Sequence, residues 1–393
     1  MRNVYIAGLG QTAVGEHWEV ALRQLAHNAA DQALRDAGGQ QPQALFVGNM
    51  LAGQLSHQAH LGALIADYCG WRGIEAATVE AAGASGGAAL RQAYLAVSSG
   101  LVDNALVIGV EKMTDKIGAG VNAALASAHD SDYEAAQGVT PTALAALLMR
   151  RYMHNYGVEL PAFAGFSVNA HANAKSNPQA MYHNTVTAEA YAQAGMVADP
   201  VNLFDTAPDA DGAAAVLLSA APNGSWPAVR VAASAAATEP LALHDRREPL
   251  HLTAAGLSAD KAYEMAGVAP EGIALFELHD AFGILAALSL EACGFAHSGE
   301  GWRLAADPHP AIARGGHIPI STFGGLKARG NPGGATGVYQ AVELALQLRG
   351  EAGKNQVGAN GAEVNGALPR WGMAQSLGGL GATAVTHIFE RVE

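Results

Sequence analysis

Short apolar segments alternate with amphipathic segments along almost the whole chain, and this alternation constrains the fold more than any other feature. Near the N-terminus the strand-like segments read "NVYIAGLG", "ALFVGNM", "AATVEAAG" and "DNALVIGVEK". Two longer segments, "HWEVALRQLAHNAADQALRDAG" and "GGAALRQAYLAVSSG", have the apolar spacing of amphipathic helices. Strands and helices in alternation predict an α/β layer architecture.

A similar order of segments returns in the C-terminal part of the chain. From about residue 227 it includes the strand-like "PAVRVAASAAAT" and "IALFELHDAF" and the helix-like "GILAALSLEACGFA" and "GGATGVYQAVELALQLRG". The sequence therefore predicts two related halves, residues 1–220 and 226–393. Residues of about 116–200 are helix-rich, His-rich and irregular, and the strand-like "DGAAAVLL" follows them. We interpret this region as an insertion in the first half, and such insertions often cover a ligand cleft.

The composition argues against several classes of partner. The 393 residues carry a net charge of −13, and their 22 Lys and Arg residues form no basic run, which argues against nucleic acid. No apolar run reaches the roughly 18–20 residues of a membrane-spanning helix, so we expect a cytoplasmic protein without a membrane partner. The cysteines, Cys69 and Cys293, are too few and too far apart for a disulfide framework or a metal site. We expect buried structural thiols and no metal.

The segment "GLGQTA", Gly8 to Ala13, follows a predicted strand and matches the dinucleotide-binding pattern G-x-G-x-x-A. A single match of this kind is weak evidence. The next helix does not begin directly after it, and no convincing acidic residue ends a strand about 20 residues later. A tight turn is therefore the preferred interpretation, ahead of nicotinamide binding.

Four stretches of small or polar residues follow predicted strands. The first, "VEAAGASGG" at 79–87, leads into a helix whose first turn has almost no side chains, so its N–H groups are open to an anion or to close packing. In the second, "FELHDAFG", His279 and Asp280 follow a buried strand and would be stranded there unless they line a site. The others are "GGLKARGNPGGATGVYQ" and "AQSLGGLGAT". Their shared position predicts one composite site.

At these stretches the chain resembles the thiolase superfamily, from about residue 3 to the C-terminus. The likeness is greatest to the branch of sterol-carrier-protein-x and the archaeal-type acetyl-CoA acetyltransferases, and "NAHANAKSNPQAM", "DGAAAVLL" and "ELHDAF" contribute to it. The resemblance implies an α/β thiolase fold, five-layered α-β-α-β-α from two similar halves, plus a helical loop domain. It also implies acyl-CoA as substrate, with CoA as part of that substrate and no permanently bound cofactor, and a homodimer.

The chain departs from the family's chemistry at three positions. By resemblance, Gly83 stands where a thiolase carries its nucleophilic cysteine, Asn331 where the base histidine of a G-H-P turn would be, and Ser376 where an acid/base cysteine would be. A nucleophile and its base act as a unit, and their loss typically costs on the order of 10⁴ to 10⁶ in rate. Ordinary thiolysis is therefore not expected, and we interpret the chain as a natural variant.

The groups that remain can still polarise a thioester carbonyl. The resemblance gives His279 a place in one oxyanion hole and the backbone N–H groups of Gly83 and Gly378 a place in the other. For the general base, Asp280, Tyr339 and a water held by Asn331 remain alternatives.

Retro-aldol cleavage of a β-hydroxyacyl-CoA needs a base and an oxyanion hole and no acyl-enzyme, so it is the favoured function. Some relatives in the sterol-carrier-protein-x branch are aldolases without the cysteine that work with a small zinc-ribbon/OB-fold partner. The alternatives are a catalytically silent acyl-CoA-binding subunit, a nucleophile supplied by a sister subunit, and a β-ketoacyl-CoA thiolase whose cysteine was mutated.

Overall fold

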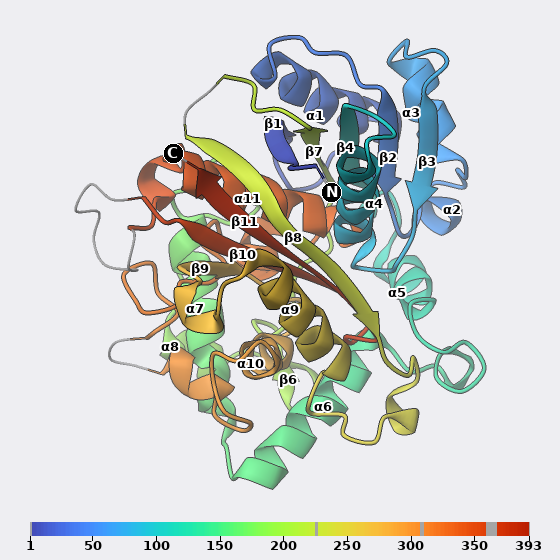
Figure 1. The fold of residues 1–393 in the computed structure, drawn as a ribbon. Helices are drawn as coiled ribbons and strands as arrows, with labels where there is room; N and C mark the ends of the chain where they lie inside the picture. Colours follow the sequence, from blue (N-terminus) through green and yellow to red (C-terminus); the bar gives the residue numbers. More distant parts are fainter. Residues whose placement is uncertain (1, 225–226, 307–309, 359–367, 393) are drawn as a thin grey trace.

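The computed structural model describes residues 2–224, 227–306, 310–358 and 368–392. In the first half, five strands lie in the order β3-β2-β4-β7-β1 (Figure 1). Strand β2 pairs in parallel with β3 and β4, whereas β7 pairs antiparallel with β4 and β1. Their bounds are β1 Tyr5–Gln11, β2 Ala44–Gly48, β3 Glu75–Val79, β4 Asn104–Glu111 and β7 Gly212–Ser219.

The second half continues the sheet in the order β8-β11-β10-β9. Strand β11 pairs antiparallel with β8 and β10, and β10 pairs in parallel with β9. The two halves join where Tyr5 of β1 pairs with Arg230 of β8, which gives one nine-stranded sheet. The bounds are β8 Ala228–Thr238, β9 Leu275–Glu277, β10 Trp371–Gly378 and β11 Thr383–Val392.

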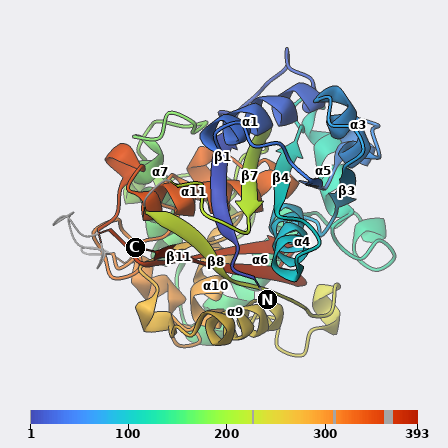
Figure 2. The ribbon, with the colours of Figure 1, turned by 45° about the horizontal axis from the view of Figure 1, so that its top comes forward.

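Helices cover and separate the two parts of this sheet, as Figure 2 shows. Helices α4 and α11 pack between the two parts, and their apolar side chains share one core with strands of both halves. Helices α1 and α3 cover the outer face of the first half, and α9 and α10 cover that of the second. The bounds are α1 Leu22–Asp36, α3 Leu61–Tyr68, α4 Ser85–Ser99, α9 Thr253–Ala266, α10 Gly283–Ala292 and α11 Thr336–Arg349. The order α-β-α-β-α confirms the predicted layers.

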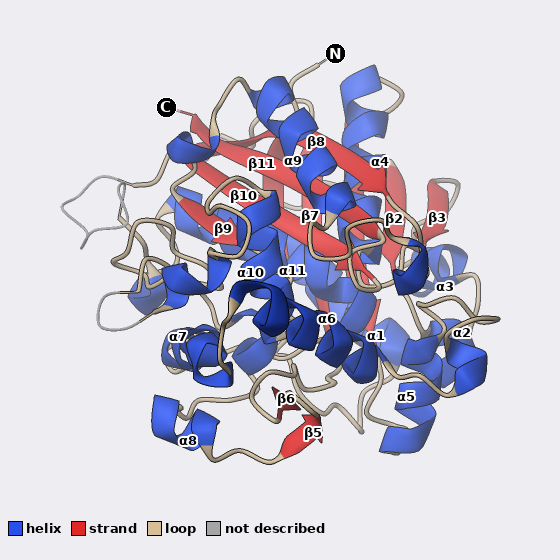
Figure 3. Cartoon of the chain, turned by 90° about the horizontal axis from the view of Figure 1, so that it is seen from below, coloured by secondary structure: helices blue, strands red, loops and turns tan. Residues whose placement is uncertain are grey.

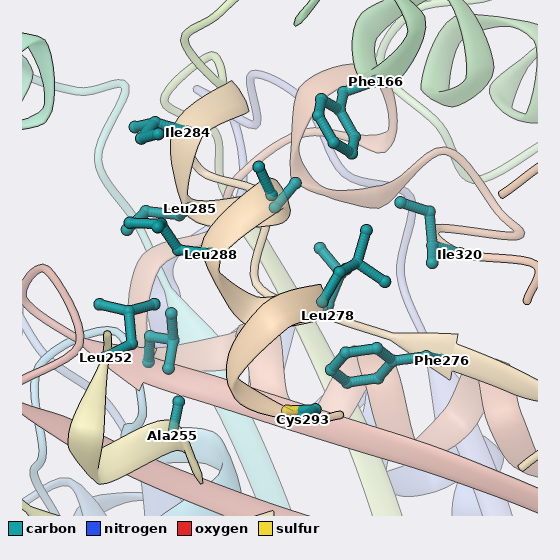
Figure 4. Packing of buried hydrophobic residues seen from close by; sticks show 14 of the residues in the cluster. Phe166, Leu252, Ala255, Phe276, Leu278, Ile284, Leu285, Leu288, Cys293 and Ile320 are labelled. Atoms are coloured by element: carbon teal, nitrogen blue, oxygen red, sulfur yellow. The ribbon is translucent and has the colours of Figure 1, made fainter. Parts of the chain in front are cut away.

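The insertion forms a helical region on one side of the molecule, beyond α10 (Figure 3). Helices α6 and α7 pack against α10, and Phe166 of α7 lies in the same apolar cluster as Leu285 and Leu288 of α10 (Figure 4). The region's elements are α5 Gly118–Ala126, α6 Pro141–Tyr156, α7 Ala164–Ala174, α8 Ala188–Ala192, β5 Met196–Ala198 and β6 Val201–Asn202, while the short α2, Ala52–Leu55, precedes α3.

The expectation of a tight turn at Gly8 to Ala13 is wrong. Gly8 and Gly10 lie within β1, where a side chain on either would meet a carbonyl oxygen of α1, that of Ala33 or Ala29. Glycine is needed here because strand and helix backbones touch. Among the helices of the described residues, none has the length and apolar character to cross a membrane.

Candidate active site

A cavity of about 220 Å³ lies where the two halves and the helical insertion meet. The first half contributes Gly83 and Asp209, the second half His279 and Asn331, and the insertion His129. The other lining residues are Met50, Asn122, Leu125, Ala128, Pro141, Thr142, Val197, Thr206, Ala207, Ala281, Phe282, Gly333, Leu377, Gly379 and Leu380. Three of the four stretches of small or polar residues thus bring Gly83, His279 and Asn331 to one cavity, and the fourth contributes Leu377.

The glycines of the first stretch have two different tasks. A Cβ on Gly86 would lie 2.8 Å from the carbonyl oxygen of Gly334, and a Cβ on Gly337 would meet the backbone of Gly87. Helices α4 and α11 therefore pack backbone against backbone. The Ser85 hydroxyl accepts the Ala81 N–H at 2.9 Å and stabilises the turn before α4.

Gly83 faces the cavity and leaves little room for a side chain. A Cβ at this position would lie 2.7 Å from the carbonyl oxygen of Leu377 and 3.1 Å from Cε1 of His279. The first distance is shorter than a van der Waals contact, so β10 would have to move to accept even a methyl group. The site is shaped around the glycine.

His279 follows β9 and presents a neutral ring to the cavity. Burial, and next the positive charge of Arg329, lower the pKa of His279 to about 4. Its buried Nδ1 makes no hydrogen bond within the described chain. An unpaired N–H costs more than an unpaired lone pair, so the tautomer protonated at Nε2 is favoured. Nε2 would lie 3.4 Å from a Cβ at Gly83, so this N–H reaches the part of the cavity beside Gly83.

Asp209 is a functional candidate that the sequence reasoning missed. Its backbone runs beside Asn331: the Asn331 N–H donates to the carbonyl of Pro208 at 3.0 Å, and the Ala210 N–H donates to the carbonyl of Asn331 at 3.2 Å. Burial raises the pKa of Asp209 to about 6. A carboxyl group with this pKa is a suitable general base near neutral pH. The stretch "APDADGAA" places this acid two residues before Asp211, which leads into β7, but the sequence does not show the burial that raises the pKa of Asp209.

His129 brings a second imidazole to the cavity from the segment after α5. Burial lowers its pKa, against the attraction of Glu134. Glu134 is fixed in turn, because its two oxygens accept the N–H groups of Leu243 at 2.8 Å and Asp130 at 3.1 Å. Sequence reasoning noted only that this region is His-rich, since nothing local marks which histidine faces the cleft.

Two of the candidate bases lie outside the cavity. The Asp280 carboxylate accepts the Leu326 N–H at 2.7 Å and the Ser321 hydroxyl at 3.0 Å, and so holds the π-helical turn Gly325–Arg329. The Tyr339 hydroxyl donates to the carbonyl of Thr12, the residue that follows β1, at 3.0 Å. Both side chains are buried, and neither lines the cavity. Neither is placed to act as the base.

Two further residues that were predicted for the site, Ser376 and Gly378, lie next to the cavity but do not line it. The Ser376 hydroxyl donates to Gln340 at 2.9 Å, between β10 and α11, and its neighbour Leu377 lines the cavity in its place. Strand alternation explains this, since successive side chains point to opposite faces. Gly378 pairs with Thr383 and packs against the Ala81 carbonyl, next to the Gly83 turn and outside the cavity lining.

Neither cysteine reaches the cavity. Cys293 lies in the apolar cluster beside α10 (Figure 4), and burial raises the pKa of its thiol. Cys69 follows α3 and is only partly buried, so the expectation of a buried thiol is wrong here; its partial burial raises the pKa of the thiol to about 11. Within the described residues, His, Cys, Asp and Glu side chains form no group of three that could hold a metal ion.

The fold is that of the thiolase class, and comparison with known proteins gives the family. Residues 4–221 match the thiolase N-terminal domain, and residues 235–391 match the thiolase C-terminal domain-like model. The chain therefore belongs to the thiolase family, whose members act on acyl-CoA thioesters.

Similar proteins extend over nearly the full length of the chain. An acetyl-CoA acetyltransferase from Methanothermobacter thermautotrophicus is 45% identical and covers 100% of both chains. The benzoylsuccinyl-CoA thiolase subunit BbsB from Thauera aromatica is 33% identical over 91% of both. Among solved structures, the Ltp2-ChsH2(DUF35) aldolase matches with a TM-score of 0.82 at 22% identity, covering 99% of this chain and 98% of its own. At this identity the last match concerns the fold alone.

Proposed function

We propose that this protein cleaves a β-hydroxyacyl-CoA by a retro-aldol reaction, without a covalent acyl-enzyme. The observation that carries the proposal is the cavity's set of reactive groups. It is lined by a carboxyl group whose pKa is about 6 and by a neutral histidine, and neither cysteine lies among its lining residues. Such groups suit proton transfer and oxyanion stabilisation, whereas acyl transfer needs a nucleophile.

In the proposed reaction the Asp209 carboxylate accepts the proton of the β-hydroxyl group. The C2–C3 bond then breaks, C3 becomes the carbonyl carbon of an aldehyde or ketone, and the electron pair passes into the thioester as an enolate. The Nε2–H of His279 and the backbone N–H of Gly83 stabilise the enolate oxygen. The proton on Asp209 then returns to C2, which gives the shorter acyl-CoA.

The remaining polar groups have supporting parts in this proposal. Asn331 runs beside Asp209 and accepts the Thr336 hydroxyl at 3.4 Å, so its amide group can orient the substrate hydroxyl. His129 is the third titratable group that lines the cavity, beside Asp209 and His279. The two relatives are named an acetyl-CoA acetyltransferase and a benzoylsuccinyl-CoA thiolase subunit, which supports an acyl-CoA substrate for this chain.

The test follows the products of 3-hydroxybutyryl-CoA. The wild-type protein is expected to release acetaldehyde and acetyl-CoA in equal amounts, measured by trapping the aldehyde and by chromatography of the CoA esters. His279→Ala should lower kcat about 10²- to 10³-fold, because it removes a donor to the developing charge. Release of acetyl-CoA without aldehyde would contradict the proposal.

A second candidate is an acyl-CoA-binding subunit without activity. The lack of room for a side chain at Gly83 favours this candidate, because it also fits a site that no longer catalyses a reaction. Binding of acyl-CoA with no cleavage, in the presence of any small zinc-ribbon/OB-fold partner that co-purifies, would support this candidate. We also propose a homodimer without a permanently bound cofactor, and light scattering after size-exclusion chromatography tests the dimer.

A further inference from the structure

A second cavity of about 430 Å³ adjoins the active-site cavity. This volume lies within the roughly 300–1,000 Å³ of small-molecule sites. Its lining includes His171 of α7, Tyr182 of the segment that leads into α8, Ala190 of α8, Phe204 and Thr206, and Lys327 of the π-helical turn. The proposed reaction does not use this second cavity.

The two cavities are separated by a single stretch of chain. Ala207 and Asp209 line the first, Pro208 lines the second, and Thr206 lines both. The stretch is fixed to the second half, because the Ala207 N–H donates to the Ala281 carbonyl at 2.9 Å. Because Thr206 lines both cavities, the second cavity lies directly beside the first.

Three rings give the second cavity an aromatic wall. His171 and Tyr182 stack with their ring centres 6.0 Å apart and their planes at 13°, and Phe204 stands edge-on to His171 at 6.0 Å. Aromatic groups favour stacked and edge-to-face neighbours of this kind. The wall is formed within the free protein, so a ring that binds here does not have to order it.

The charges of the lining residues argue against a ligand that carries a phosphate group. Of the described residues that line the second cavity, Lys327 alone is charged, and its Nζ already donates to the carbonyls of Asp205 at 2.6 Å and Phe204 at 3.3 Å. Burial lowers the pKa of His171, against the hydrogen bond from its Nδ1 to the carbonyl of Asn184 at 3.0 Å, so the neutral ring is favoured. The phosphorylated adenosine of CoA therefore finds no free cation here, whereas an uncharged ring does not need one.

We propose that the second cavity binds an aromatic ring at the end of the substrate's acyl group, so that the preferred substrate is an aryl-terminated β-hydroxyacyl-CoA. This proposal rests on the proposed function, because it takes the β-hydroxy thioester to lie between Asp209 and His279. The aromatic wall then determines which acyl group is selected, and the first cavity performs the reaction.

The test compares 3-hydroxy-5-phenylpentanoyl-CoA with 3-hydroxybutyryl-CoA. Wild type should have a kcat/KM at least about tenfold higher for the phenyl substrate. Ala190→Trp fills the second cavity and should remove this preference, while Ala192→Trp, on the same short helix but outside the lining, should keep it. Tyr182→Ala, at a side chain 40% exposed, should lower kcat/KM for the phenyl substrate about 3- to 10-fold and leave the short substrate unchanged.

Equal kcat/KM for both substrates, or an unchanged preference in Ala190→Trp, would overturn the inference and leave the proposed function standing. If wild type cleaves neither substrate, the proposed function fails, and calorimetry tests the second cavity by itself. Tighter binding of the phenyl ester, lost in Ala190→Trp and kept in Ala192→Trp, would then support the aromatic site. Equal affinity of wild type for the two esters would overturn it.

Discussion

At the residue scale, Gly83 and Asp209 together determine what the cavity can do. Gly83 leaves no space for a nucleophilic side chain, and Asp209 supplies a carboxyl group whose pKa is near neutrality. His279 could be singled out from the sequence because it follows a buried strand, whereas Gly83 and Asn331 were indicated by the resemblance to thiolases. Asp209 could not be singled out, since burial, which the sequence does not show, raises its pKa.

Replacing Gly83 by a residue with a side chain is expected to destabilise the fold. Gly83→Ala should lower the free energy of unfolding by about 1–3 kcal/mol, because its Cβ would overlap the Leu377 carbonyl. Urea unfolding measures the change, and Gly53→Ala, whose Cβ meets nothing within 4 Å, is the matched control.

Because a side chain at Gly83 does not fit, Gly83→Cys combined with Asn331→His should not restore thiolysis of acetoacetyl-CoA. A double variant that is active and as stable as wild type would show that the site does accept a side chain.

The activity should depend on pH through Asp209. The base must be ionised, so kcat/KM for cleavage is expected to rise with pH and to level off above about 6, where the Asp209 carboxyl has lost its proton. Asp209→Asn should lower kcat/KM about 10²- to 10⁴-fold, whereas Asp260→Asn, at an exposed carboxylate of α9, should leave it unchanged. A wild-type profile that is flat from pH 5 to 8 would contradict the role of Asp209.

Stability gives an independent reading of the same carboxyl group. The folded-state pKa of Asp209 is raised above its unfolded value, so its contribution to stability is complete below about pH 4 and is lost as pH rises through about 6. Asp209→Asn should therefore gain stability relative to wild type as pH rises from 4 to 7. Thermal unfolding at several pH values measures this difference, and no change with pH would contradict the raised pKa.

At the element scale, several strands and helices could be predicted from the sequence. The direction in which the side chains at their ends point could not. The segments at 44–50, 86–100 and 333–350 form β2, α4 and α11 as expected, because the first is a short apolar run and the other two have helical apolar spacing. Strand β9, by contrast, is only Leu275–Glu277, and His279 and Asp280 beyond it point to different surroundings. That difference sends Asp280 to the π-helical turn and His279 to the cavity, and it depends on contacts far apart in sequence.

Glu111 joins three elements beneath the cavity. It ends β4, and its carboxylate accepts the N–H groups of Met50 and Leu51, at the β2–α2 turn, and of Gly334, just before α11. Glu111→Ala should lower the free energy of unfolding by at least about 3 kcal/mol, because it leaves these buried donors without a partner. Glu75→Ala, at an exposed position of β3, is the control, and equal urea midpoints for the two variants would contradict this role.

At the scale of the whole molecule, the cavity exists only where the two halves and the insertion meet. Gly83 comes from the first half, His279 and Asn331 from the second, and His129 and Val197 from the insertion. The two halves could be predicted because the order of strands and helices recurs, and the five layers were implied by the resemblance to thiolases. The second cavity could not, because its aromatic wall joins α7, the following segment and residues 203–208.

A ligand in this cavity should protect all three parts together. On addition of acetyl-CoA, hydrogen exchange is expected to slow in peptides that cover 83–87, 279–282 and 125–142, since binding to the folded state stabilises every element the ligand contacts. Peptides of α1 and α3, on the outer face, are the internal control. Protection confined to one half would contradict a composite site.

The central claim, carbon–carbon cleavage without an acyl-enzyme, is tested most directly by intact-protein mass spectrometry during turnover. With 3-hydroxybutyryl-CoA in excess, acetaldehyde and acetyl-CoA should accumulate while the protein keeps its unmodified mass at every time point. A protein species heavier by one acetyl group, formed and consumed at the rate of turnover, would contradict the account.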